Sequence, residues 1–131
     1  MGMGTHPKLS VHLHTDDDPR VFVFGSNLLG IHGKGAAAYA RARLGAEHGI
    51  EEGITGRAYA LPTCSRPGVR LSFYAVELAV IRFLDYARAT PNVRYFVSEV
   101  GCGLAGFTAE QIAPLFADAP DNCDLPPGWR K

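Results

Sequence analysis

Residues 21–45 read VFVFGSNLLGIHGKGAAAYARARLG and combine an apolar β-run, a polar glycine-rich turn and an alanine-rich helix. Residues 21–24 are β-branched or aromatic and carry no charge, which is typical of a strand buried on both faces of a parallel sheet. Residues 36–44 are strong helix formers, and Gly45 is placed to close the helix. This order of strand, flexible loop and helix start predicts an α/β protein whose loop holds an anion.

The glycine-rich turn suggests a phosphate ligand, because a helix N-terminus offers unpaired N–H groups and glycines allow close approach. The glycine-rich turn matches neither of two well-known phosphate-binding sequence motifs closely. Gly25 and Gly30 have the spacing of a P-loop, but Ile31 and His32 stand where that loop needs Lys and Ser or Thr. Residues 33–38 spell GxGxxA, yet they lie well beyond the end of the strand, and no acidic residue ends a clear second strand about twenty positions later. A glycine-rich connection without a ligand stays open as the alternative.

The composition indicates one domain over residues 1–131, with residues 1–8 disordered. A chain of this length can bury about 68% of its unfolded surface. The 13 basic side chains equal the 13 acidic ones, so the excess of positive charge that attracts a nucleic-acid backbone is missing. No apolar run approaches the roughly 18 residues of a membrane helix, and the N-terminus lacks a signal pattern. We therefore expect a cytoplasmic monomer without a membrane or nucleic-acid partner.

The cysteines and the N-terminal histidines are candidate metal or catalytic groups. Cys64, Cys102 and Cys123 are widely spaced without a CxxC pair, which argues against a disulfide framework and a zinc site. Cys64 follows a predicted strand, but no neighbouring His in the sequence argues for an activated thiolate. His12 and His14 share one face of an alternating strand near residues 9–14; without a third ligand, we expect an exposed polar face and no metal.

The remaining elements are predicted from the turn-forming residues and from the spacing of the apolar residues. Residues 46–56 read as a long surface connection. The predicted strands are 57–61, ended by Pro62, then 94–97 and 123–125. A turn-like segment occupies residues 63–68, and Trp129 is expected to pack on the body. Residues 71–90 form the clearest helix, with an apolar stripe that faces the sheet: Phe73, Val76, Val80, Phe83, Leu84 and Ala87.

A second glycine-rich loop, SEVGCGLAGF at residues 98–107, follows the strand at 94–97. Thr108 with Gln111 forms a capping box that starts a short helix, which Pro114 should kink or stop. Phe107 and Ile112 fit a hydrophobic staple across that helix start. Because parallel strands place their carboxyl ends at one edge, both loops should face one crevice, which suits a diphosphate.

These two loops resemble those of macrodomains, the ADP-ribose-binding α/β modules. FGSNLLGIHGKGAA at residues 24–37 resembles the first ligand loop of that family, and VGCGLAGF at 100–107 resembles the second, in its GCGL variant. With YALPT at 59–63, the order of motifs is also similar to small, often phage-associated macro-like proteins. The resemblance spans residues 21–116. It implies a three-layer α/β fold with a mixed sheet of about five strands and helices on both faces.

The resemblance also implies a ligand site. Asn27 would hydrogen-bond the distal ribose, and Gly33 and Gly35 would approach that ribose or the α-phosphate. Phe107 matches an aromatic residue near the ribose, unless the staple holds it. Backbone N–H groups of the second loop would wrap the diphosphate, and further contacts would come from the first loop and its neighbours: Gly101, Cys102, Gly103, Leu104, Ala105 and Gly106, with Gly25, Ser26, Lys34, Ala36 and Thr63. Asp16 or Asp17 is the candidate for the acidic residue at the adenine amine, although its spacing to Asn27 is short of the family pattern.

Catalysis follows less directly from the resemblance. GCGL-bearing hydrolases use a lysine before the strand at 57–61 and an aspartate directly after GCGL. Thr55 and Ala105 stand near those positions here, so the covalent lysine route is not expected. A water could still attack the anomeric carbon, with Asn27 orienting the ribose and His32 or Lys34 supplying acid, base or charge.

The sequence thus predicts a protein that binds ADP-ribose or a related NAD-derived nucleotide, without a cofactor. Its partner would be the free nucleotide or an ADP-ribosylated macromolecule. Hydrolysis of an ADP-ribosyl linkage is a possible activity of that same site. The alternatives are a non-catalytic reader or sponge of such a ligand and an interaction protein that kept only the fold.

Overall fold

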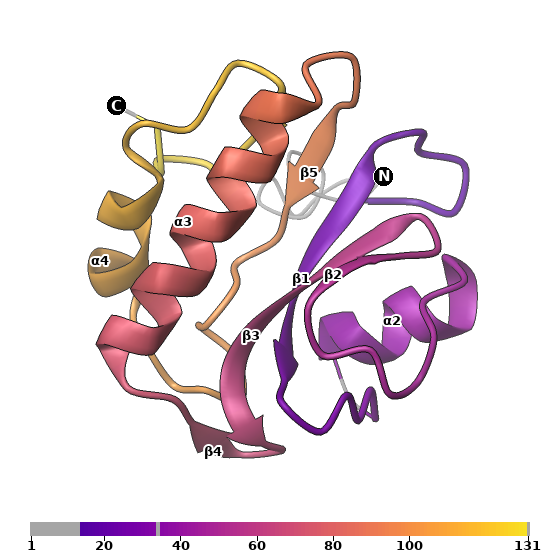
Figure 1. The fold of residues 1–131 in the computed structure, drawn as a ribbon, viewed down its shortest axis with the longest axis vertical. Coiled ribbons are helices and arrows are strands. Elements are labelled where there is room, and N and C mark those ends of the chain that lie inside the picture. Colours follow the sequence, from indigo (N-terminus) through magenta and orange to yellow (C-terminus); the bar gives the residue numbers. More distant parts are fainter. Residues whose placement is uncertain (1–13, 34, 131) are drawn as a thin grey trace, which may run out of the picture.

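The computed structural model describes residues 14–33 and 35–130, in which a mixed β-sheet carries helices on both faces (Figure 1). The strand order is β2-β3-β1-β5-β6, and β4 pairs with β3. The pairs β1–β3, β1–β5 and β5–β6 are parallel, whereas β2 and β4 run antiparallel to β3. The strands are β1 Val21–Asn27, β2 Gly53–Thr55, β3 Ala58–Arg66, β4 Val69–Arg70, β5 Tyr95–Val97 and β6 Cys123–Asp124; the helices are α2 Gly35–Arg43, α3 Phe73–Ala89, α4 Ala109–Ile112 and the 3₁₀ helix η1 Ala113–Phe116. The predicted α/β class is confirmed, with six strands in the described sheet.

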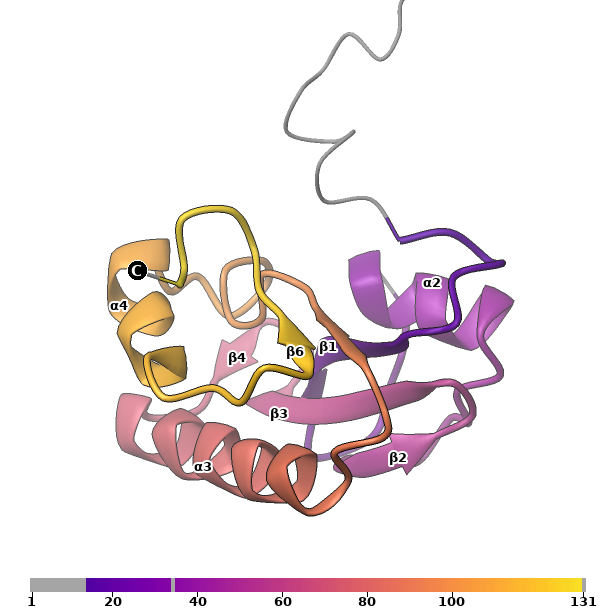
Figure 2. The ribbon, with the colours of Figure 1, turned by 90° about the horizontal axis from the view of Figure 1, so that it is seen from above.

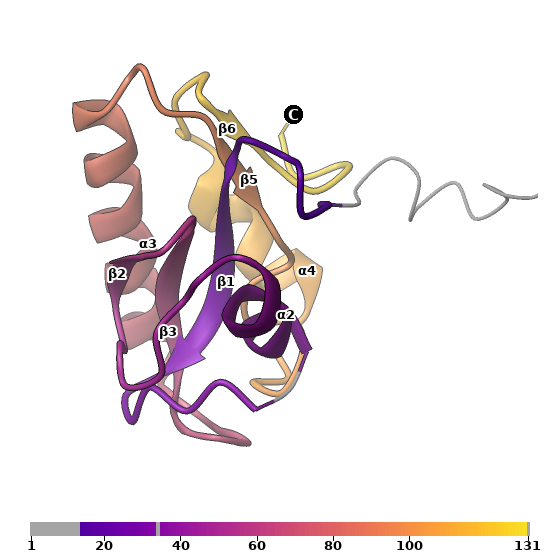
Figure 3. The same cartoon turned by 90° about the vertical axis from the view of Figure 1, so that its right-hand side faces the viewer.

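Alternation along β1 divides the apolar side chains between two cores. Phe22 and Phe24 point to the α2 face, whereas Val23 belongs to the cluster beneath α3 and η1. Figures 2 and 3 show α2 and α3 on opposite sides of the central strands. Ala37 and Ala40 are the buried residues of α2, and their small side chains let the helix lie close to the sheet. The buried strand predicted at residues 21–24 is therefore the first half of β1, and its side chains contribute to both cores.

The long helix α3 confirms the predicted apolar stripe, with one exception. Val76, Val80 and Phe83 are fully buried, as are the neighbouring positions of the stripe at Leu84 and Ala87. Ser72 caps the helix by accepting a hydrogen bond from the Ala75 N–H group. Phe73 was expected on this stripe, but it lies in the first turn and is 40% exposed, with its ring centroid 6.1 Å from that of Phe107.

The strand predicted at 57–61 does not end at Pro62. It continues to Arg66 as β3, and residues 63–66 pair with β4 or β1 instead of forming a turn. Pro62 lies opposite Ser26, where the β1–β3 register shifts between Ser26 and Asn27. Proline has no N–H group to donate to a neighbouring strand, and within sheets it is tolerated at such irregularities.

The connection predicted over residues 46–56 contains a strand that the sequence pattern did not indicate. β2 pairs antiparallel with β3 through Ile54 and Tyr59. Its three residues are too few to display an alternation of apolar and polar side chains, and it lies at the edge of the sheet.

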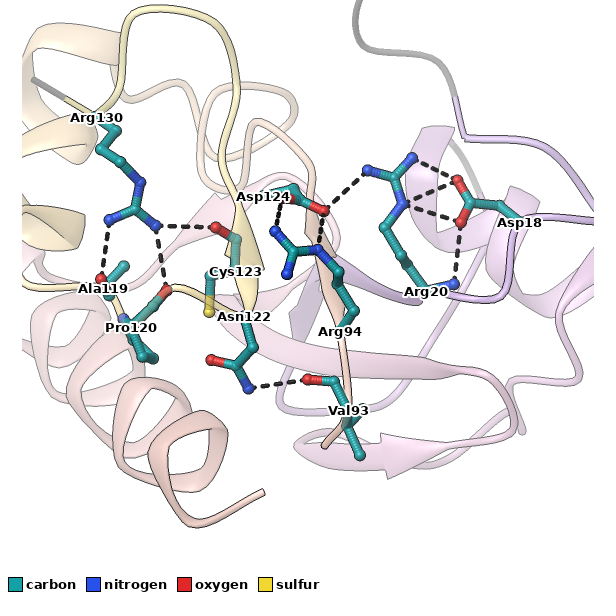
Figure 4. Close-up of polar contacts among 10 residues, drawn as sticks. All are labelled: Asp18, Arg20, Val93, Arg94, Ala119, Pro120, Asn122, Cys123, Asp124 and Arg130. Atoms are coloured by element: carbon teal, nitrogen blue, oxygen red, sulfur yellow. Dashed lines mark hydrogen bonds and ion pairs between the residues drawn. The ribbon is translucent and has the colours of Figure 1, made fainter. Parts of the chain in front are cut away.

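The C-terminal segment is fastened to the sheet by polar contacts at the amino ends of β1 and β5 (Figure 4). Asp124 accepts two hydrogen bonds from Arg94, at 2.7 and 2.9 Å, and a third from Arg20 at 3.2 Å. The Asn122 amide donates to the Val93 carbonyl oxygen at 2.9 Å. Trp129 is 5% exposed and packs near Phe116. The predicted strand near residue 123 and the packing of the tryptophan are confirmed.

The predicted capping box is also present: the Thr108 side chain accepts from the Gln111 N–H group, and the Gln111 side chain accepts from the Thr108 N–H group. Helix α4 then tightens to the 3₁₀ helix η1 with Pro114 in its first turn, as expected for a proline that stops an α-helix. None of the described helices is both long enough and apolar enough to cross a membrane.

Candidate functional site

The two glycine-rich loops line one pocket at the carboxyl ends of β1 and β5. These strands are parallel neighbours, so their loops leave the sheet at the same edge. The pocket has a volume of about 700 Å³. A third wall comes from the β3–β4 hairpin, through Thr63, Cys64, Pro67 and Gly68. The expectation that both loops face one crevice is confirmed.

Gly25 forms the floor between the loops. A methyl group placed on its Cα would lie 3.1 Å from the Thr63 hydroxyl oxygen and 3.6 Å from the Gly101 amide nitrogen. Glycine therefore allows β1, β3 and the second loop to approach one another closely beneath the pocket.

Asn27 organises the first loop through its side chain. The side-chain oxygen accepts hydrogen bonds from the N–H groups of Leu29 and Ile31, both at 3.1 Å, and the amide nitrogen donates to the Ile31 carbonyl at 2.9 Å. Asn27 is 7% exposed and lines the pocket. Because a primary amide has two donor hydrogens, one remains for a ligand once the loop is built.

The second loop presents a row of free backbone donors. Within residues 14–33 and 35–130, no acceptor takes the N–H groups of Gly101, Gly103, Leu104 and Ala105. All four residues line the pocket. A concave run of unpaired N–H groups attracts anions, so this loop is suited to a phosphate or carboxylate.

Most of the residues proposed from the sequence lie together around the pocket. Those that line it are Gly25, Ser26, Asn27, Gly33, Gly35, Ala36, Thr63, Gly101, Gly103, Leu104 and Ala105. Cys102, Gly106 and Phe107 do not line it, and their N–H groups donate to carbonyl oxygens within the loop. The Phe107 ring lies in the core, with the Arg70 guanidinium 4.6 Å above it. Phe107 and Ile112 share that core cluster, as the predicted staple requires.

The groups proposed for proton transfer are not gathered in the pocket. His32 is 2% exposed, and its Nε2 atom donates to the Ile50 carbonyl oxygen at 3.2 Å. Its ring packs edge-on against Phe24, and it does not line the pocket. Burial lowers the pKa of His32, so the neutral imidazole is favoured. Lys34 lies outside the described residues.

Asp16 and Asp17 lie away from the pocket, near the amino ends of β1 and β3. Asp16 pairs with Arg43 at 2.9 Å, and its carbonyl oxygen accepts a hydrogen bond from Arg57, directly before β3. The amino and carboxyl ends of parallel strands are separated by the length of the strands, so these carboxylates do not reach a ligand in the pocket.

Glu99 is the acidic residue that does line the pocket, and sequence reasoning missed it. The signal was available, since Glu99 follows β5 at the edge where α/β sheets bind ligands. Ser98, Pro67 and Gly68 were missed as well. The segment at residues 63–68 was predicted to be a turn at the ligand-binding edge of the sheet, but Pro67 and Gly68 within it were not assigned to the ligand.

The described residues give little evidence for a bound metal ion or for a reactive cysteine thiolate. No group of three His, Cys, Asp or Glu side chains could share a metal ion there. His12 lies outside the described residues. His14, expected on an exposed face, is buried and makes hydrogen bonds to the Tyr39 hydroxyl at 2.8 Å and the Arg20 carbonyl at 3.1 Å. Burial raises the pKa of the Cys102 thiol, which disfavours a reactive thiolate.

Comparison with known proteins gives a distant structural likeness. No family model matches the chain, and no curated protein matches its sequence. The chain is similar to the solved structure of a macrodomain protein from Streptomyces coelicolor, with 18% sequence identity and a TM-score of 0.48, over 81% of this chain and 86% of that chain. The case for a function is therefore made from the site itself.

Proposed function

We propose that this protein binds ADP-ribose or a related NAD-derived nucleotide in the pocket between its two glycine-rich loops. The observation that carries the proposal is the row of free N–H donors at Gly101, Gly103, Leu104 and Ala105, in a pocket that the first loop shares. These donors suit an anionic group such as a diphosphate. The FGSN and GCGLAG motifs that supply the loops resemble those of ADP-ribose-binding macrodomains.

The size and walls of the pocket support a nucleotide. A volume of about 700 Å³ lies within the range of sites for small organic ligands. Ile31 and Leu104 stand on opposite loops and keep apolar side chains exposed, at 38% and 57%. Apolar surface beside an anion-binding loop fits a ligand that joins a flat base or sugar to a phosphate.

Binding without turnover is favoured over hydrolysis by the placement of the titratable groups. Among the described residues that line the pocket, Glu99 is the one with a charged side chain, and no histidine is among them. A reader or sponge of an ADP-ribose-type ligand needs no acid or base. Incubation with an ADP-ribosylated protein should therefore release no ADP-ribose, and steady release by the pure protein would restore the hydrolase alternative.

The binding proposal is tested by thermal unfolding with ADP-ribose, AMP, ribose 5-phosphate and NAD. ADP-ribose at about 100 times its dissociation constant should add roughly 2.7 kcal/mol to the free energy of unfolding, which raises the midpoint by several degrees. No shift with any of the four ligands would contradict the proposal.

Gly103→Ala tests whether the second loop makes the contact. A methyl group at this position meets no atom within 4 Å, so the free protein should unfold at an unchanged temperature. In the complex, the methyl group would stand where a phosphate must approach the backbone, so ADP-ribose should bind about tenfold or more weakly. Asp118→Asn, beside the distant C-terminal end of α3, is the control and should bind as the wild type does.

A further inference from the structure

The polar side chains that line the pocket are nearly all engaged in the fold. The Ser26 hydroxyl donates to the Glu51 carbonyl at 2.5 Å, and the Ser98 hydroxyl donates to the Val23 carbonyl at 2.6 Å. The Thr63 hydroxyl is directed at the Ser26 carbonyl, 3.4 Å away, and Asn27 holds its own loop. These side chains build the walls and leave little hydrogen-bonding capacity for a ligand.

Glu99 is different from its neighbours in the wall. It is exposed and lines the pocket, and its carboxylate makes no hydrogen bond or ion pair with any of residues 14–33 and 35–130. Its backbone is nevertheless fixed, because the Cys102 N–H group donates to the Glu99 carbonyl at 3.1 Å and closes a turn over Gly101, which has a φ of 80°. The backbone that carries this free carboxylate is thus fixed beside the anion-binding loop.

The N–H groups of the second loop and the carboxylate of Glu99 favour ligand groups of opposite kinds. The N–H row of the second loop donates hydrogen bonds and favours an anion. A carboxylate only accepts hydrogen bonds, and it repels an anion placed next to it. A ligand satisfies both when its anionic group lies on the loop and hydrogen-bond donors lie a few atoms further along, at Glu99.

Resting on the proposed function, we propose that Glu99 determines specificity by accepting hydrogen bonds from the vicinal hydroxyl groups of a ribose. Two adjacent hydroxyls match the two oxygens of one carboxylate, and hydrogen bonds to a charged acceptor are about twice as strong as neutral ones. The same charge weakens the binding of bare polyanions such as pyrophosphate, which offer no hydroxyl group to offset the repulsion. Glu99 thereby selects a sugar phosphate or nucleotide over an inorganic phosphate.

The test compares Glu99→Gln with the wild type by titration calorimetry against ADP-ribose, ribose 5-phosphate, 2-deoxyribose 5-phosphate and inorganic pyrophosphate. The exposed side chain makes no hydrogen bond or ion pair with the described residues, so the variant should fold, and thermal unfolding without ligand checks this. In the wild type, ribose 5-phosphate should bind more tightly than its deoxy form. Glu99→Gln should weaken ADP-ribose and ribose 5-phosphate about tenfold, remove the difference from the deoxy form, and tighten pyrophosphate.

Glu99→Gln is expected to weaken the binding of ADP-ribose and ribose 5-phosphate but to tighten the binding of pyrophosphate. A general loss of structure would weaken the binding of all the ligands. A loss of affinity for all four ligands together, no change for any of them, or an equal loss for the ribose and deoxyribose phosphates would overturn the assignment of Glu99. Asp118→Asn removes a carboxylate elsewhere and should change none of these affinities. If ADP-ribose fails to bind the wild type while ribose 5-phosphate still depends on Glu99, the proposed function fails and the role of Glu99 stands.

Discussion

Gly25 and Gly101 lie against each other beneath the pocket, so that a methyl group on Gly25 would stand 3.6 Å from the Gly101 amide nitrogen. One glycine lies in the second half of the central strand β1, and the other belongs to the loop that follows the neighbouring strand β5. Their contact joins the two loops at their bases, far apart as they are in the sequence. The shape of the pocket floor therefore depends on the absence of a side chain at residue 25.

Gly25→Ala should fold but bind ADP-ribose poorly. The added methyl group would lie 3.1 Å from the Thr63 hydroxyl oxygen and would fill the floor of the pocket. We expect a loss of stability of about 1–3 kcal/mol and at least a tenfold loss of affinity, measured by urea unfolding and titration calorimetry. Wild-type affinity in a folded Gly25→Ala protein would show that the ligand does not reach the floor.

Gly30→Ala should destabilise the first loop much more than a change at its neighbour. Gly30 has a φ of 67°, and a methyl group there would come within 2.4 Å of the Gly49 backbone. Strain and overlap together should lower the free energy of unfolding by roughly 2–4 kcal/mol. Leu29→Ala, at a side chain that is 56% exposed, is the matched control and should change it by less than about 0.5 kcal/mol. Equal urea midpoints for the two variants would refute this account of the loop.

His32 should make the protein less stable in mild acid. Burial, with help from the nearby His48 and Arg41, lowers the pKa of His32 below its ordinary value of 6.5. The unfolded chain then binds a proton more readily, so stability is fully present above about pH 6.5 and falls as the pH drops below it. Unfolding midpoints from about pH 7.5 to about pH 5 should decline less steeply in His32→Gln, which keeps a donor near the Ile50 carbonyl. Identical slopes in both proteins would mean that His32 does not titrate differently on folding.

Asp18 should contribute stability that is lost only in strong acid. Its hydrogen bonds from Arg20 hold its pKa at about 2, below the ordinary 3.8. Because the folded pKa is depressed, this contribution is present above pH 3.8 and disappears as the pH falls from there to about 2. The free energy of unfolding should therefore change less steeply over that range in Asp18→Asn than in the wild type. Asp17→Asn, at the exposed neighbour, is the charge control, and a slope like that of Asp18→Asn would contradict the role of the Arg20 pair.

Much of the fold was predictable from the sequence because local signals and burial agreed there. The apolar run in β1, the stripe of α3 and the capping box at Thr108 each satisfy a rule that holds within a few residues. β2 and the second half of β3 were not predictable in this way. Ile54 gains its partner only from long-range pairing, and Pro62 stays in its strand because the register shifts opposite it.

The candidate site was likewise predictable where the sequence signal is local, and not where it depends on long-range packing. Both glycine loops were recognised because glycine, asparagine and a following helix form a local pattern. The placement of Glu99, and that of His32 behind Phe24, depends on which way the chain turns after β5 and β1. Asp16 and Asp17 were proposed from the resemblance to macrodomains, but the length of β1 separates them from Asn27 at its other end.

The most direct test of the account is the amide NMR spectrum of ¹⁵N-labelled protein as ADP-ribose is added. If the two loops form one anion site, the amide signals of Gly101, Gly103, Leu104 and Ala105 should shift together with those of Gly33 and Gly35, along a single binding curve. Signals at Asp16 and Asp17 should stay in place. Shifts confined to one loop, or a spectrum that ADP-ribose leaves unchanged, would contradict a shared nucleotide site between the loops.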